Sequence, residues 1–251
     1  MVAKRIIPCL DVKDGQVVKG IHFEGLRQVG DPVELGAAYA REGADELVFL
    51  DISATLEGRK TFSALVTQIA RHIDIPFTVG GGIGSIEDAA RLLDAGADKI
   101  SVNSAAIADP SLIGRIAGKY GSQFVVVAID AKCIDGRWTC TTHGGKCLTD
   151  VELFSWAREA QERGAGEILF TSMDHDGTCS GYADAVYARL ADELTIPVIA
   201  SGGAGSVEDI RRVLTEGRAD AALAASIFHY GQIPIPTLKQ ALRAANVNVR
   251  I

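Results

Sequence analysis

Two aspartates end apolar segments in the two halves of the chain and could carry out acid–base chemistry. Asp11 ends the segment Arg5–Asp11 and Asp130 ends the segment Phe124–Asp130, at an offset of 119 residues. Two carboxylates that face each other across one cavity suit general acid–base catalysis, because one can accept a proton while the other donates one. A single aspartate in such a position more often caps a turn. A pair related by an internal repeat instead favours a catalytic site.

A glycine-rich turn occurs twice with the same residue order. Val79–Asp88 reads VGGGIGSIED and Ile199–Asp209 reads IASGGAGSVED, so that Gly81 corresponds to Gly202 at an offset of 121 residues. Each copy predicts a strand, a tight turn and a helix N-terminus, where backbone N–H groups can approach an anion closely. One copy is often only a tight connection, whereas two copies at a fixed offset predict two phosphate sites on a duplicated scaffold.

Small and polar residues at neighbouring strand ends extend both predicted phosphate sites. The candidates are Gly81, Gly82, Asn103 and Ser104 in the first half, and Ser201, Gly202, Gly203, Ala225 and Ser226 in the second. If these strands end at one rim, the two sites face each other with the aspartates between them, which predicts a long ligand with a phosphate at each end. The alternative is that Asn103 and Ser104 only cap the following helix, because capping and phosphate binding use the same groups.

Four charged residues stand at the opposite ends of predicted strands, where each strand begins. They are Arg5, Glu46, Lys99 and Glu167, two of each sign. Isolated buried charges are costly, so these side chains must pair with each other if they point inward. The sequence leaves two interpretations open, a solvated rim and a charged ring that closes this end of the fold.

Eight apolar segments alternate with eight helical segments, and these elements must position the residues above. Strands are predicted at Arg5–Asp11, Glu46–Ile52, Phe77–Gly80, Lys99–Val102, Phe124–Asp130, Glu167–Ser172, Val198–Ser201 and Ala221–Ala224. Helices are predicted at Pro32–Glu42, Phe62–His72, Ile86–Asp94, Ser111–Lys119, Val151–Arg163, Ala183–Leu194, Val207–Glu216 and Pro236–Ala245. Alternation of this kind indicates a parallel sheet buried on both faces, and eight units predict an α/β fold, the (β/α)8 TIM barrel. Gly43, Gly96 and Gly164 are expected to end three of the helices.

The internal repeat divides the chain into two halves of four βα units each. Arg41–Asp51 matches Glu162–Ser172, again at an offset of 121 residues. No proline- or serine-rich linker or low-complexity run interrupts the sequence. We therefore predict one domain over residues 1–251, built from two duplicated (β/α)4 half-barrels at about residues 1–122 and 123–251.

Two long connections follow the strands that carry the aspartates. Lys13–Gly30 and Lys132–Thr149 lack a strong regular pattern and are candidate lids over the site. The first holds Lys19 and His22, and the second holds His143, Gly144 and Lys146. Both histidines are more typical of a loop surface than of catalysis, because no third partner is visible for either.

Further candidates follow the second, sixth and eighth strands. Asp174, Asp176, Gly177 and Thr178 are expected to face the site, with Asp176 and Gly177 as substrate-binding candidates. Asp51 could contact ligand hydroxyls. His229 stands in an apolar run, where a histidine is more often packed than reactive.

Composition excludes several classes of function. The formal net charge of −7 argues against general binding to nucleic acid or to anionic membranes. The five cysteines are scattered without a C-x-x-C pair, so neither a metal site nor a disulfide framework is predicted. No signal peptide or membrane-spanning stretch is visible. We therefore expect a cytoplasmic protein whose chemistry needs no metal and no cofactor.

Four segments resemble the cyclase-subunit family of imidazole glycerol phosphate synthase. They are Arg5–Gly15 (RIIPCLDVKDG), Asp130–Lys132 (DAK), Asp174–Thr178 (DHDGT) and Asn246–Arg250 (NVNVR), and the resemblance runs from Ala3 to Arg250. It implies an ammonia-dependent lyase of histidine biosynthesis. Such an enzyme converts phosphoribulosyl formimino-aminoimidazole carboxamide ribotide, a bisphosphate, to imidazole glycerol phosphate and aminoimidazole carboxamide ribotide.

The resemblance also implies roles for individual residues. Asp11 and Asp130 match the acid–base pair, and Lys19 matches a residue of the mobile catalytic loop. Arg5, Glu46, Lys99 and Glu167 match a gate through which ammonia enters from a glutaminase subunit docked on the barrel bottom. The partnership is a heterodimer, and Asp98 is expected near its interface.

Some positions depart from the family pattern, and two other functions stay open. The departures are His22, Gly144, His175, Cys179 and the apparent insertion Arg218. The first alternative is the sister phosphoribosyl formimino ribotide isomerase, another duplicated barrel with opposed aspartates but without ammonia or a partner. The second is a non-catalytic ribotide-binding scaffold. The charged strand starts and the segment Ile7–Gly15 favour the cyclase over the isomerase, and the intact aspartates argue against a scaffold.

Overall fold

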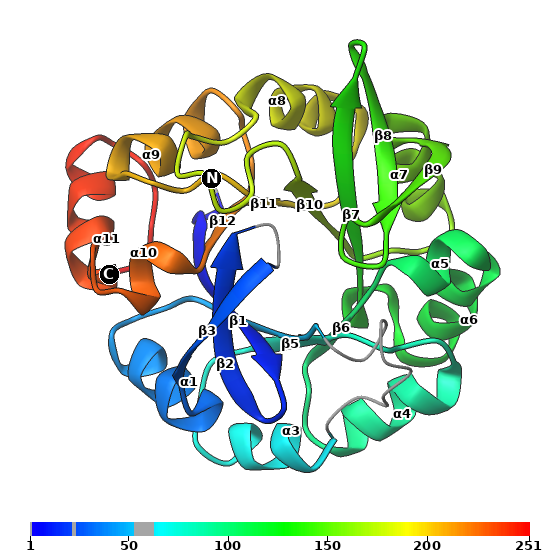
Figure 1. Cartoon of the computed structure of the whole chain (residues 1–251), viewed down its shortest axis with the longest axis horizontal. Coiled ribbons are helices and arrows are strands. Elements are labelled where there is room, and N and C mark those ends of the chain that lie inside the picture. Colours follow the sequence, from blue (N-terminus) through cyan, green and yellow to red (C-terminus); the bar gives the residue numbers. More distant parts are fainter. Residues whose placement is uncertain (1, 22–23, 53–62) are drawn as a thin grey trace.

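A closed ring of eight parallel strands forms the centre of the computed structural model, which describes residues 2–21, 24–52 and 63–251 (Figure 1). The ring consists of β1 (Arg5–Lys13), β4 (Leu47–Asp51), β5 (Phe77–Gly80), β6 (Lys99–Val102), β7 (Val125–Ile134), β10 (Glu167–Ser172), β11 (Val198–Ser201) and β12 (Ala221–Ala224). Each strand pairs in parallel with the next, and β12 pairs back with β1. The predicted (β/α)8 barrel is therefore confirmed.

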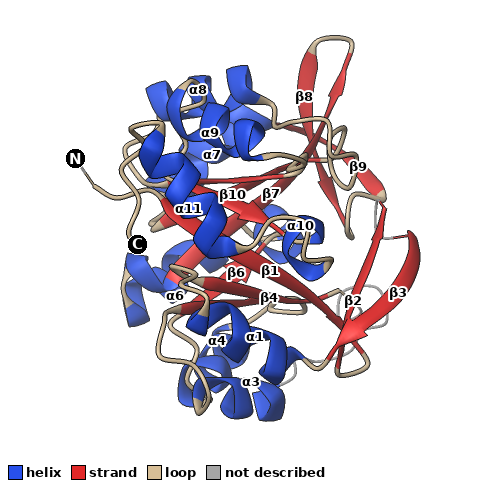
Figure 2. Cartoon of the chain, turned by 90° about the vertical axis from the view of Figure 1, so that its left-hand side faces the viewer, coloured by secondary structure: helices blue, strands red, loops and turns tan. Residues whose placement is uncertain are grey.

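Helices cover the outside of the ring in a second layer (Figures 1 and 2). The long ones are α1 (Pro32–Arg41), α3 (Ser63–Ala70), α4 (Ile86–Asp94), α6 (Ser111–Tyr120), α7 (Leu153–Glu162), α8 (Asp184–Glu193), α9 (Val207–Thr215) and α11 (Ile235–Ala244). Among the described residues, three short elements were not predicted, namely α5 (Ser104–Ala108), the 3-10 turn η1 (Ser122–Phe124) and α10 (Ser226–His229). In the described ranges, every helix is too short or too polar to cross a lipid bilayer.

The expectation of two irregular connections was wrong, because both contain antiparallel strands. β1 continues into β2 (Gln16–Ile21) and β3 (Glu24–Gly30), and β7 continues into β8 (Arg137–Thr142) and β9 (Cys147–Glu152). The missed signal was an Asp-Gly pair in each connection, since both residues of both pairs have positive φ and such a two-residue turn favours a hairpin. Residues 22 and 23 between β2 and β3 lie outside the described chain.

Two apolar regions hold the layers together. The larger lies between the outer face of the strands and the helices, and includes Phe49, Phe170 and Tyr187, all fully buried. The smaller lies inside the barrel, where Ile7, Val48, Val126, Leu169 and Ile199 meet. The strands are therefore buried on both faces, which explains their nearly continuous apolar sequences.

The two glycine-rich turns have the same local geometry, as the internal repeat predicts. Ser85 caps α4 with φ −148° and ψ 166°, and Ser206 caps α9 with φ −146° and ψ 165°. In both turns the hydroxyl accepts from the backbone N–H of the residue three positions later, Asp88 or Asp209. The side chains of Ser85 and Ser206 thus cap their helices, and these hydrogen bonds fix the direction of the backbone that precedes each helix.

The connections from helix to strand use a second repeated device. Gly43, Gly96 and Gly164 follow their helices with φ between 90° and 105°, as expected of C-terminal glycines. An aspartate two residues later accepts a hydrogen bond from a strand's backbone, as Asp45 does from Ile6 (2.8 Å). Asp98 accepts the matching bond from Phe77 (3.0 Å). Asp220 accepts one from Val198 (3.0 Å) in a further connection, where Arg218 with φ 56° stands in place of the glycine.

Gly166 stands two residues after Gly164, where the matching connections have an aspartate. It has a steric reason to be glycine and provides a test of the packing. A Cβ at Gly166 would collide with the backbone of Ser122 in η1, while a Cβ at Gly118 in α6 would meet nothing within 4 Å. We expect Gly166→Ala to lower the free energy of unfolding by roughly 1–3 kcal/mol, because the backbone must shift. Gly118→Ala should raise it by about 0.5–1 kcal/mol through helix propensity. Urea unfolding of both variants measures the difference, and equal stability would contradict the proposed fit.

Candidate active site

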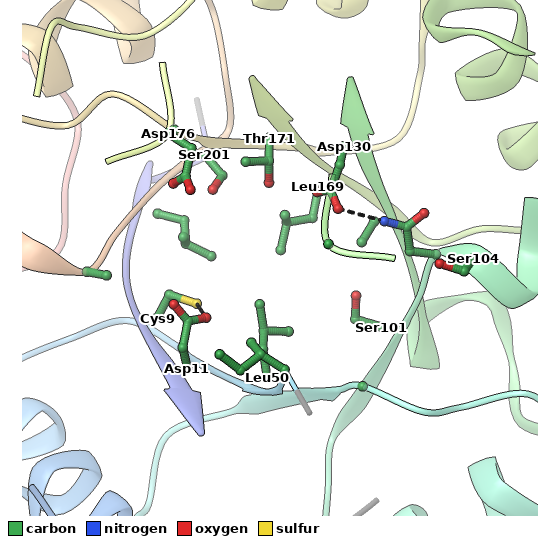
Figure 3. A pocket seen from close by; sticks show the side chains of 18 of the residues that line it. Cys9, Asp11, Leu50, Ser101, Ser104, Asp130, Leu169, Thr171, Asp176 and Ser201 are labelled. Atoms are coloured by element: carbon green, nitrogen blue, oxygen red, sulfur yellow. Dashed lines mark hydrogen bonds between the residues drawn. The ribbon is translucent and has the colours of Figure 1, made fainter. Parts of the chain in front are cut away.

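A cavity of about 570 Å³ opens at the carboxyl-terminal ends of the barrel strands. Fourteen predicted catalytic and binding residues line it: Asp11, Lys19, Gly81, Gly82, Asn103, Ser104, Asp130, Asp176, Gly177, Ser201, Gly202, Gly203, Ala225 and Ser226. Asp11 and Asp130 lie on opposite sides of it, as Figure 3 shows. β1 and β7 are four strands apart in the ring of eight, so the fold alone produces this opposition.

Asp11 lies at the end of β1 beside Lys19 of the adjacent strand β2. The Nζ atom of Lys19 lies 3.6 Å from Oδ2 of Asp11, and both side chains are largely buried. Burial raises the pKa of Asp11, the charge of Lys19 lowers it, and the negative charge of Asp176 raises it further. The net shift is upward, because one partner at this distance does not outweigh the loss of solvent around the carboxylate.

Among the described residues, the side chains that donate hydrogen bonds to Asp130 are neutral. Its Oδ2 atom accepts a hydrogen bond from Nδ2 of Asn103 at 2.9 Å. Burial and the charge of Asp176 raise the pKa of Asp130 to about 7, although hydrogen bonds from Thr171 and Asn103 oppose that rise. A carboxyl group with such a pKa can both hold and release a proton near neutral pH.

Both glycine turns exclude side chains where the chain bends into the cavity. A Cβ at Gly81 would collide with the carbonyl oxygen of Asp51, and a Cβ at Gly202 would lie 2.6 Å from that of Ser172. Gly81 and Gly202 also have φ of 101° and 87°, a region that other residues rarely adopt. The backbone therefore lines the cavity directly at two places, which suits close contact with phosphate oxygens.

The side chains of Asn103 and Ser104 do not cap α5, so the capping interpretation was wrong for them. Asn103 makes no capping hydrogen bond, and its amide is directed at Asp130. The hydroxyl of Ser104 accepts a hydrogen bond from the backbone N–H of His143 at 3.1 Å. Asn103 instead connects the end of β6 to Asp130 of β7, and Ser104 connects it to the turn after β8.

The four charges at the strand starts point inward and pair, so the interpretation as a solvated rim was wrong. Arg5 contacts Glu46 at 2.8 Å and Glu167 at 3.1 Å, and Lys99 contacts each glutamate at 2.8 Å. Burial alone would lower the pKa of Arg5 and raise that of Glu167. The opposite charges outweigh burial, so the pKa of Arg5 is raised and that of Glu167 is lowered.

Some expectations about the rim were wrong. Within the described chain, Asp51, Asp174 and Thr178 are not among the residues that line the cavity. Asp174 instead accepts a hydrogen bond from the backbone N–H of Cys133 at 2.8 Å and so fastens the loop after β10 to β7. His143, expected on the loop surface, is exposed but lines the cavity. His22 lies outside the described residues.

The cavity also contains residues that sequence reasoning did not name as site residues. Thr171 and Ser101 point into it, and Cys9 lies with its Sγ atom 3.9 Å from Asp11 (Figure 3). Thr171 is the second-last residue of β10 and pairs with Asp130 across the β7–β10 ladder. The rule that strand ends face the site could have found it. His229 is packed as expected, with Nδ1 2.7 Å from the hydroxyl of Tyr39.

The departures from the family pattern have different surroundings. Cys179 lines the cavity, and Gly144 does so with φ 65°. His175 lies behind the second glycine turn, with Nδ1 2.7 Å from the hydroxyl of Ser172. Arg218 lies away from the cavity and pairs with Asp192 at 2.8 Å on the surface.

An eight-stranded α/β barrel with opposed carboxyl groups at its carboxyl-terminal mouth defines the class as a (β/α)8-barrel enzyme. A family model described as histidine biosynthesis protein matches residues 5–234. The chain is 61% identical over 251 residues to the imidazole glycerol phosphate synthase subunit HisF of Phocaeicola vulgatus. It is 62% identical over 250 residues to that of Bacteroides thetaiotaomicron and 59% identical over 251 residues to that of Flavobacterium johnsoniae. In each comparison 100% of both chains is covered.

The chain therefore belongs to the histidine biosynthesis protein family, in the group of the HisF subunits of imidazole glycerol phosphate synthase. The family resemblance found in the sequence is confirmed.

The raised pKa of Asp130 predicts how stability changes with pH. Between about pH 4 and 7 the folded state holds this proton while the unfolded chain has released it, so folding becomes less favourable as pH rises. Asp130→Asn removes the titration, and we expect its free energy of unfolding relative to the parent to rise by on the order of 2 kcal/mol from pH 5 to pH 8. Urea unfolding at both pH values measures this change.

The matched control is Asp135→Asn, the same substitution in the exposed β7–β8 turn away from the cavity. A difference between Asp130→Asn and the parent that does not change with pH would show that the folded state does not hold the proton.

Proposed function

We propose that this chain is the cyclase subunit of a cytoplasmic imidazole glycerol phosphate synthase. It would use ammonia to convert phosphoribulosyl formimino-aminoimidazole carboxamide ribotide to imidazole glycerol phosphate and aminoimidazole carboxamide ribotide. One observation carries the proposal: Asp11 and Asp130 face each other in one cavity between two matching glycine turns. The names of the full-length relatives support it.

The turns and the strand ends suit the two phosphates of such a substrate. Gly81 and Gly202 belong to opposite halves of the barrel, and in both turns the backbone lines the cavity without a side chain. A bisphosphate held at its two ends would lie across the mouth with its central atoms between the two aspartates. Binding at remote phosphates would then hold the reacting centre in position, which is a large part of catalysis for a reaction that joins two molecules.

The two aspartates differ in a way that suits acid–base chemistry. Asp130, with a pKa of about 7, would give a proton to the carbonyl oxygen that leaves as water when ammonia adds to the ribulosyl carbon. Asp11, beside the positive charge of Lys19, would take a proton from the attacking nitrogen. We therefore assign proton donation to Asp130 and proton acceptance to Asp11 in this step.

The lower part of the barrel would admit ammonia from a glutaminase partner. The ring of Arg5, Glu46, Lys99 and Glu167 lies below a lumen lined by apolar residues. Neutral ammonia can cross such a lumen, whereas an ammonium ion would have to be desolvated. A partner docked at this end, near the exposed Asp98, would deliver ammonia past the ring without release to water.

The assay that tests the function follows loss of substrate absorbance at about pH 8 with excess ammonium salt, where some free ammonia is present and a fraction of Asp130 still holds its proton. We expect ammonia-dependent turnover, and we expect Asp11→Asn and Asp130→Asn each to lower kcat by at least roughly 100-fold, the usual range for loss of an acid or base. The substrate affinity of both variants should change little, because neither aspartate is proposed to contact a phosphate. Asp135→Asn in the exposed turn is the matched control.

Other outcomes would identify a different protein function. Isomerisation of the preceding ribotide without use of ammonia would identify an isomerase. Tight binding with no reaction, unchanged by both aspartate substitutions, would indicate a scaffold.

The ring makes a separate prediction about ammonia delivery. Lys99→Met leaves Glu46 and Glu167 with Arg5 as their remaining cation, and loss of a buried partner typically costs about 3–5 kcal/mol. We expect lower thermal stability and weaker glutamine-dependent turnover with the glutaminase, but nearly unchanged turnover with added ammonium salt. Lys119→Met on the surface of α6 is the control. Equal losses with both nitrogen sources would contradict a role in delivery.

A further inference from the structure

The turn between β8 and β9 is joined to Ser104, a residue of the first-half site, by a hydrogen bond from His143. We propose that this turn, residues 143–146, binds the phosphate in the first-half site through His143 and Lys146. It would thereby decide which end of the bisphosphate lies there. The inference rests on the proposed function, because it assumes a ligand with a phosphate at each end.

The turn is held in place by contacts on both of its sides. The backbone N–H of His143 donates to the hydroxyl of Ser104 at 3.1 Å, which joins the turn to the end of β6. The Nδ1 atom of His143 lies 3.1 Å from the hydroxyl of Thr142, which orients the ring. Gly145 packs so tightly on Met173 that a Cβ there would collide with the Met173 side chain. The position of the turn is therefore set by packing.

Its polar groups face the same space as the first glycine turn. His143, Gly144 and Lys146 line the cavity together with Gly82 and Ser104. Because the Ser104 hydroxyl accepts from His143, its own proton is available for another acceptor. Lys146 makes no ion pair within the part of the chain that the structure describes. A phosphate at Gly82 would offer acceptors to the hydroxyl, the imidazole Nε2 and the ammonium group.

The cations near the two sites differ in how they are held. Gly203 and Ser226 correspond to Gly82 and Ser104 in the internal repeat, and Ser226 begins α10. A lysine also reaches this half of the lining, because the charge of Lys19 acts on Asp176 and on His229 of α10. Lys19, however, already pairs with Asp11, whereas Lys146 makes no ion pair among the described residues.

Direct titration of the protein with the formimino ribotide, without ammonia, tests this assignment. The variant is His143→Asn with Lys146→Gln, because asparagine tolerates the φ of 55° found at His143 and keeps the backbone N–H. We expect roughly tenfold weaker binding, the usual scale for loss of charge-assisted contacts to a phosphate. Arg137→Gln is the matched control, since Arg137 is an exposed cation of the same hairpin away from the cavity. Thermal melting of each variant checks that the fold is intact.

A double-mutant cycle places the effect at one end of the ligand. Ser104→Ala should show a non-additive effect with the turn variant, because the two groups share one phosphate. Ser226→Ala, its counterpart in the other half, should be additive with the turn variant. Unchanged affinity of the turn variant, or coupling to Ser226 instead of Ser104, would overturn the assignment while leaving the proposed function intact. Failure of the parent protein to bind or convert the ribotide would overturn the proposed function itself.

Discussion

Closure of the strand ring, completed where β7 pairs with β10, is the constraint on which the rest of the molecule depends. The ladder runs from Glu167 opposite Val126 to Ser172 opposite Ala131, and it sets Thr171 beside Asp130. In a closed parallel ring all strands end at one rim and begin at the other. Acid–base groups, glycine turns and hairpins therefore collect at one end, and the charged strand starts collect at the other.

Burial acts on charged groups at both ends of the barrel but with opposite results. In the lower ring each cation contacts both glutamates, so that opposite charge outweighs the loss of solvent and the pKa of Glu167 falls. At the mouth Asp130 receives hydrogen bonds from neutral groups and lies near the negative Asp176, so burial raises its pKa to about 7. Burial therefore has opposite outcomes for the two carboxyl groups. Glu167 stays ionised because two cations contact it, whereas Asp130 can hold a proton near neutral pH because its neighbours are neutral or negative.

The two halves have the same backbone geometry at their glycine turns and differ in the side chains around them. Ser85 and Ser206 hold their turns with nearly identical dihedral angles. The hairpins that follow the first strand of each half differ, since β2 places Lys19 beside Asp11 while the β8–β9 turn is joined to Ser104. A symmetric frame with asymmetric additions suits a ligand that carries similar phosphates on two different ends.

The sequence by itself determined the barrel, its strand and helix positions to within a few residues, and the residues at the strand ends. These features depend on local signals: apolar runs, glycines with positive φ, and serines that cap the next helix. The internal repeat also places Asp11 opposite Asp130, because strands one and five of eight must oppose each other.

Only the tertiary structure decided how the side chains pair. The ion pairs among the four basal charges, the bond from Asn103 to Asp130 and the contact between His143 and Ser104 join residues that are far apart in the sequence. The upward shift of the pKa of Asp130 also requires the tertiary structure, because it depends on burial and on the charge of Asp176. No local pattern encodes such contacts, because they form only when the ring closes and brings distant strand ends within hydrogen-bond distance.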